Sequence, residues 1–134
     1  MKAIAAALAI VLLLTATGCE IPQLTGFVEP NLAKKRAQQM TGGNADNGRA
    51  LIVKYGCSSC HTVPGVRGAQ GKVGPPLTDF ALRVYVAGKF PNNVTNVVNW
   101  IRTPQQMDPR TAMPNMGVTE QDAKDIAAYL YTLQ

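Results

Sequence analysis

The sequence predicts an all-α fold for the part of the chain that begins near residue 44. Three stretches there place small or apolar residues at i, i+3, i+4 and i+7, which is the period of an amphipathic helix. No stretch alternates apolar and polar residues as a half-buried strand does. With 134 residues, 46% of them hydrophobic, the chain is long enough for one domain with a single core.

The N-terminal residues have the three parts of a secretory signal: Lys2, an apolar run over residues 3–14, and small residues up to Gly18. A helix over those twelve residues would be about 18 Å long, whereas the core of a bilayer is about 30 Å thick. We therefore expect residues 1–18 to be a signal peptide. It would send the chain to the extracytoplasmic, periplasmic side.

Gly18-Cys19 resembles the end of a bacterial lipobox, in which Cys19 would be lipidated and become the mature N-terminus. Ala16-x-Gly18 would also suit an ordinary signal peptidase, but that cleavage leaves an unpaired thiol in an exported protein. We expect a lipoprotein anchored in the membrane through Cys19. Residues 19–43, rich in Gly and Pro, would form a membrane-proximal tether, in which residues 31–40 could make a short helix.

Residues 44–134 form the expected globular domain. Its first helix carries the stripe Gly48, Leu51, Ile52 and Tyr55, and a glycine inside a helix indicates that something approaches its backbone closely. The last helix begins with a capping box from Thr119 to Asp122. Small residues at 127 and 128 in that helix suit a tight crossing with the first one.

Between these two helices the sequence predicts an ordered Gly- and Pro-rich loop over residues 62–76 and a short helix over residues 79–87. A further helical stripe follows at Val94, Val97, Val98 and Ile101. It should end before Pro104, since the residue ahead of a proline avoids the α region.

The motif Cys57-x-x-Cys60-His61 is typical of covalent haem attachment. Each thiol adds to one vinyl group of the haem, and the adjacent imidazole then binds the iron. The 6% aromatic content agrees with a core completed by a bound ring. A zinc site would need a fourth ligand, and the only other cysteine is Cys19; a thiol redox pair expects a βαβ context that is not visible.

His61 is the only histidine in the chain, so the second iron ligand is expected to be a methionine sulfur. Met113 is the preferred candidate because it begins a non-helical Met-Pro turn between two helices. Thr111, two residues earlier, can fix that turn by hydrogen bonding. Met116 and Met107 remain alternatives, and Met40 lies in the tether.

With these motifs in place, residues 44–134 resemble a class I bacterial cytochrome c. The resemblance rests on Gly48 and Ile52, Cys57-x-x-Cys60-His61, Gly74-Pro75-Pro76-Leu77, Pro104 and Pro109, Thr111-x-Met113-Pro114, and Ala128-Tyr129-Leu130. It implies about four short helices wrapped around one haem c, with crossing terminal helices and His61 and Met113 as iron ligands.

The resemblance also implies roles for three further residues. The carbonyl of Pro75 would accept a hydrogen bond from the His61 imidazole. Arg83 falls where relatives place an arginine near a haem propionate. Trp100 falls where many relatives have a tyrosine that lines the methionine side of the haem.

An iron with both axial positions filled favours one-electron transfer over substrate chemistry, so we expect an electron carrier and not an enzyme with a small-molecule substrate. The net charge of +5 favours acidic protein partners. The sequence shows no nucleic-acid-binding motif, which argues against a nucleic acid as the partner. Expected partners are a quinol-oxidising complex as donor and a haem-copper oxidase as acceptor. Plausible docking residues are Lys54, Arg67, Lys72 and Lys89.

Two alternatives stay open. The first is a permanently docked haem subunit of a larger respiratory or dehydrogenase complex. The second is a ligand-binding or peroxidatic haem protein in which Met113 does not bind the iron.

Overall fold

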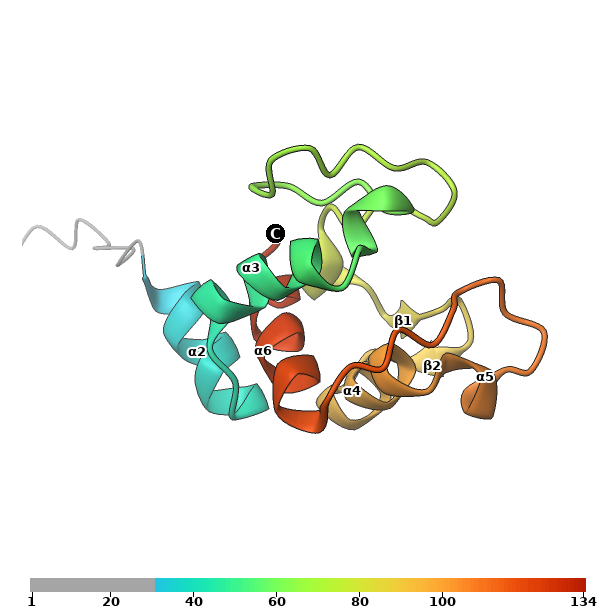
Figure 1. The fold of residues 1–134 in the computed structure, drawn as a ribbon. Helices are drawn as coiled ribbons and strands as arrows, with labels where there is room; N and C mark the ends of the chain where they lie inside the picture. Colours follow the sequence, from blue (N-terminus) through green and yellow to red (C-terminus); the bar gives the residue numbers. More distant parts are fainter. Residues whose placement is uncertain (1–30) are drawn as a thin grey trace, which may run out of the picture.

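The computed structural model describes residues 31–134 (Figure 1). These residues form five α-helices, two short 3-10 helices and one two-stranded sheet, so the all-α prediction is confirmed. The helices are α2 (Leu32–Thr41), α3 (Ala45–Lys54), α4 (Val94–Arg102), α5 (Pro104–Met107) and α6 (Glu120–Leu130), with η1 (Cys57–Ser59), η2 (Phe80–Leu82), β1 (Tyr85–Val86) and β2 (Phe90–Pro91). The expected signal peptide and Cys19 lie outside the described residues.

Helices α3 and α6 cross at the centre of the molecule (Figure 1). The Asn44 side chain caps α3 by accepting hydrogen bonds from the backbone N–H groups of residues 46 and 47. A Cβ atom at Gly48 would lie only 1.9 Å from the carbonyl oxygen of Asp125. The close approach expected from this glycine is therefore present, and the fully buried Ala127 and Ala128 lie directly after the contact point.

A buried carboxylate holds this crossing in register. Asp125 is 5% exposed and accepts hydrogen bonds from the Asn44 backbone N–H at 2.8 Å and from the Gln121 side chain at 3.0 Å. A buried carboxylate without such donors would be costly, so the start of α3 is held at this point of α6.

Helix α2 falls within the expected tether, and the structure packs it against α6 (Figure 1). Ala37 and Thr41 are buried, and a Cβ at Gly43 would lie 2.2 Å from the carbonyl oxygen of Lys124. The short helix expected near residues 31–40 is thus present as part of the folded unit. The tether residues before 31 lie outside the described part of the chain.

The prediction of a helix over residues 79–87 was wrong. Only η2 is helical there, and an antiparallel hairpin follows in which Val86 pairs with Phe90. Asp79, Ala87 and Gly88 have positive φ values of 52°, 54° and 68°, which a right-handed helix cannot accommodate. The last two form the hairpin turn, the kind of left-handed turn that matches the twist of paired strands.

The loop over residues 62–76 is ordered, as expected. The Tyr129 hydroxyl of α6 donates a hydrogen bond of 2.6 Å to the carbonyl oxygen of Pro64. Gly65 has φ +73°, which favours glycine, and a Cβ there would lie 2.5 Å from that hydroxyl oxygen, so any larger residue would require the tyrosine to shift.

Among residues 31–134, no helix combines the length and the apolar character needed to cross a membrane.

Candidate haem site

One cavity brings together all of the cofactor-binding residues that the sequence singled out between residues 44 and 134. It has a volume of about 360 Å³, and helices α3, α4 and α6 contribute apolar side chains to its wall, among them Ile52, Val97 and Leu130. The expected residues that line it are Cys57, Cys60, His61, Pro75, Arg83, Trp100, Thr111 and Met113.

The proximal histidine is oriented by a backbone carbonyl. His61 Nδ1 lies 2.7 Å from the carbonyl oxygen of Pro75, and because a carbonyl can only accept, Nδ1 carries the proton and Nε2 keeps its lone pair. This is the contact that the family resemblance implied for Pro75. A Cβ at Gly74 would lie 2.3 Å from His61 Cε1, so the ring occupies space that only a glycine leaves open.

The two cysteines lie on the cavity wall at the start and just past the end of η1. Both are partly buried, and burial raises the pKa of the Cys57 thiol. The structure has no group of three or more His, Cys, Asp or Glu side chains within residues 31–134 that could hold a metal ion.

The methionines expected as candidates for the second iron ligand lie at different places in the structure. Met113 and Met116 both line the cavity, whereas Met107 lines a separate surface depression beside α4. The backbone N–H of Met113 donates to Thr111 Oγ1 at 3.2 Å, as the spacing suggested. The Gln105 side chain also donates to the Met113 carbonyl at 2.7 Å, a contact that no local pattern revealed because it joins two different segments.

Arg83 and Trp100 line other parts of the cavity. The Arg83 guanidinium donates to the carbonyl oxygens of Pro76 and Thr78, the latter at 2.9 Å. These two hydrogen bonds hold the loop segment 76–78, which directly follows the Pro75 carbonyl. The Trp100 ring packs against Phe90 of β2 with 5.9 Å between centroids.

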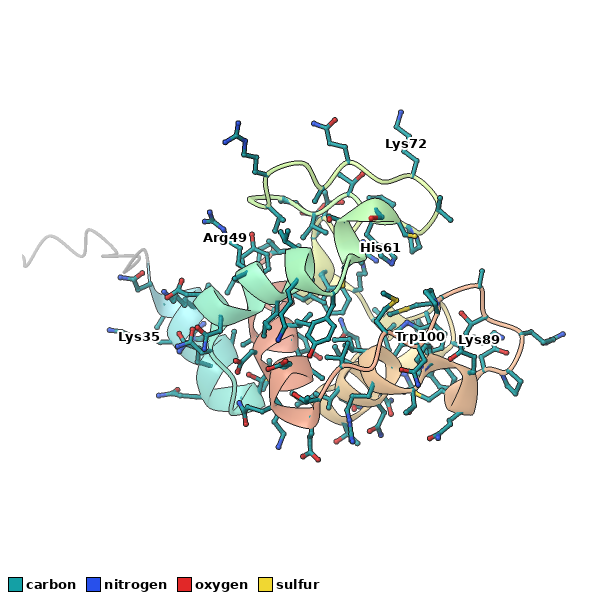
Figure 2. All side chains as sticks on the ribbon, in the orientation of Figure 1. Lys35, Arg49, His61, Lys72, Lys89 and Trp100 are labelled. Atoms are coloured by element: carbon teal, nitrogen blue, oxygen red, sulfur yellow. The ribbon has the colours of Figure 1, made fainter. Side chains whose placement is uncertain are left out.

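The four basic residues that the sequence suggested for docking differ in their surroundings. Lys89 is paired with Asp108, and Lys54 Nζ lies 3.6 Å from Asp122 Oδ2. Within the described part of the chain, Arg67 and Lys72 are exposed and have no ion pair, and Figure 2 shows Lys72 projecting from the loop.

A hydrogen bond next to the cavity makes stability depend on pH. The Tyr55 hydroxyl donates to Asp122 Oδ2 at 2.6 Å, which raises the pKa of Tyr55 and lowers the pKa of Asp122. The contribution of Asp122 is complete above about pH 4 and is lost as the pH falls through its folded pKa; that of Tyr55 is complete below about pH 10 and is lost as the pH rises.

We expect Tyr55→Phe to lower the free energy of unfolding at neutral pH. In this variant the free energy of unfolding should also decrease less steeply than in the wild type at acid pH and at alkaline pH. Urea unfolding followed by circular dichroism across that range measures it. Tyr85→Phe is the matched control, because Tyr85 is 54% exposed. A Tyr55→Phe profile that parallels the wild type would contradict this role.

The fold and the cavity together define a small all-α protein whose residues fit a covalently bound haem: two thiols beside an oriented imidazole, facing an apolar space with methionines in its wall. Residues 45–134 match the family model described as Cytochrome c. The chain belongs to this family and is a class I c-type cytochrome. The family binds haem covalently and uses it for electron transfer.

Two curated relatives carry a similar segment. The chain is 35% identical over 91 residues to cytochrome c oxidase subunit 2 of Alkalihalophilus pseudofirmus and 32% identical over 94 residues to cytochrome c oxidase subunit 2 of Bacillus sp. strain PS3. Each match covers 67% of this chain and 26% of the relative, so the chain spans about a quarter of their length. No solved structure matches the chain significantly.

Proposed function

We propose that this protein carries single electrons through one haem c, attached at Cys57 and Cys60 and bound axially by His61 and Met113. The observation that carries the proposal is the cavity that these four residues share. When bound, the haem supplies a one-electron couple between Fe(III) and Fe(II).

The chain's own residues account for the properties that a carrier needs. The Pro75 carbonyl keeps the proton on His61 Nδ1 and leaves the Nε2 lone pair available to bind iron. This hydrogen bond also makes the imidazole a more basic ligand. Thr111 and Gln105 hold the backbone of Met113 from two directions. The apolar side chains of the cavity wall would surround the haem, and a neutral thioether in such surroundings favours the reduced state.

The proposal includes the location and the partners. A signal peptide over residues 1–18 and a lipid on Cys19 would hold the domain at the extracytoplasmic side of a membrane. The donor would be a quinol-oxidising complex and the acceptor a haem-copper oxidase. The names of the two relatives support the oxidase side, because both are oxidase subunits. Tethering raises the concentration at which such partners meet.

The same names support a second candidate, in which the domain is a permanently docked subunit of an oxidase or another respiratory complex. Mild solubilisation and purification through a tag on this chain separates the two. A stoichiometric partner that stays bound through high salt indicates a fixed subunit, and recovery of the chain alone indicates a mobile carrier.

The electron-transfer proposal is tested with the purified, haem-loaded chain. We expect the reduced protein to give one electron per chain to a haem-copper oxidase, with a rate that falls as salt rises. We also expect the reduced protein not to bind carbon monoxide readily, because both axial positions are filled. Rapid carbon monoxide binding, or turnover of peroxide, would instead support the ligand-binding alternative.

A further inference from the structure

An ion pair joins the hairpin to the segment that leads into Met113. Lys89 lies in the turn between β1 and β2, and its Nζ contacts Oδ2 of Asp108, directly after α5. The Asp108 side chain is only 15% exposed, while that of Lys89 is 49% exposed. Figure 2 shows Lys89 on the same side of the molecule as the orange segment that follows α5.

Asp108 organises the backbone between α5 and Met113. Its N–H caps α5 by donating to the Pro104 carbonyl at 2.9 Å, and its own carbonyl accepts from the Thr111 N–H at 3.0 Å. Its carboxylate also accepts from the Arg110 N–H at 3.2 Å. Since Thr111 Oγ1 in turn accepts from the Met113 N–H, a continuous set of hydrogen bonds runs from Asp108 to Met113.

The hairpin is a fixed support for this segment. The Lys89 N–H donates to the Val86 carbonyl at 3.2 Å and closes the turn, and Val86 is 5% exposed. Val86 and Ala87 line the same cavity as Met113, and Phe90 is held against Trp100. The lysine therefore reaches Asp108 from a wall of the cavity.

We infer that Lys89 and Asp108 are positioning residues for Met113: their ion pair holds segment 108–113 against the hairpin and keeps the methionine at the cavity. The inference rests on the proposed function for the role of Met113 as a ligand. It also reassigns Lys89, because a lysine engaged with Asp108 holds the site together and is less available to a docking partner.

Removing the charge of Lys89 should loosen the segment locally. The Asp108 carboxylate would keep one backbone donor but lose its counter-ion in a shielded place, where a charge-assisted hydrogen bond is stronger than on an open surface. In Lys89→Gln we expect the amide hydrogens of Thr111 and Met113 to exchange with solvent about five- to tenfold faster.

The test is hydrogen exchange followed by NMR on the reduced, haem-loaded protein. Lys89→Arg is the conservative variant and should restore the wild-type rates. Lys34→Gln is the matched control, because it breaks the ion pair between Lys34 and Asp46 on the other side of the fold. Exchange in α6 should stay unchanged in all three variants.

Faster exchange confined to segment 108–113, together with rescue by arginine, supports the inference. Unchanged exchange there, an effect no larger than that of Lys34→Gln, or equal acceleration in α6 overturns it. Carbon monoxide binding to the same samples separates the two proposals. If the wild type binds it rapidly, Met113 is not the ligand, while the exchange rates still decide whether Lys89 and Asp108 hold the segment.

Discussion

Gly48→Ala is expected to cost about 3 kcal/mol or more of folding free energy. The added Cβ would lie 1.9 Å from the Asp125 carbonyl oxygen and 2.5 Å from its carbonyl carbon. Both atoms belong to the backbone of α6, so no side-chain rotation can make room and the two helices must move apart. That movement also pulls the buried Asp125 carboxylate away from the Asn44 N–H.

Urea unfolding followed by circular dichroism measures this loss, and poor recovery of folded protein would be its extreme form. Gly68→Ala is the matched control: it has φ +78° and no atom within 4 Å of the added Cβ. It should cost only about 1–2 kcal/mol, the strain of a left-handed alanine. Equal losses in the two variants would show that the close crossing does not limit stability.

Met113→Ala is expected to remove the sixth iron ligand completely. The oxidised protein should lose the weak far-red band of methionine ligation and become high-spin, the reduced protein should bind carbon monoxide, and the reduction potential should fall. Optical spectra with and without carbon monoxide and a redox titration measure these changes.

Met116→Ala is the matched control, since Met116 lines the same cavity but is 46% exposed and lies three residues further along. It should keep the wild-type spectrum. Loss of the far-red band in Met116→Ala and its retention in Met113→Ala would reverse the assignment. If both variants keep it, the sixth ligand lies elsewhere in the chain.

Local chemistry made much of this protein predictable. The spacing of Cys57, Cys60 and His61 predicts haem attachment from a few neighbouring residues, and the structure brings all three to one cavity. The capping box at Thr119 places the start of α6, where the structure has its side chain accepting from the Asp122 N–H at 3.1 Å. Gly48 signalled a close helix contact because glycine is costly in a helix unless space demands it.

Other features depend on contacts between segments that no local pattern records. Residues 79–87 read as a helix, but the pairing of Val86 with Phe90 and the positive φ values around it make a hairpin. The composition before residue 44 is that of a tether, yet α2 packs against α6. This packing is possible because Gly43 has no side chain and lets the Lys124 carbonyl of α6 come close to its backbone.

The amino-acid order thus determined the haem motif, the amphipathic faces of the main helices and the candidate methionines, because each depends on residues only a few positions apart. The tertiary structure decided which distant groups meet: the Gln105 side chain donates to the Met113 carbonyl, and Lys89 pairs with Asp108. It also decided that the Asp125 carboxylate accepts a hydrogen bond from the Asn44 N–H at the start of α3. These contacts join groups brought together only when the helices pack, and their energy depends on the burial that packing creates.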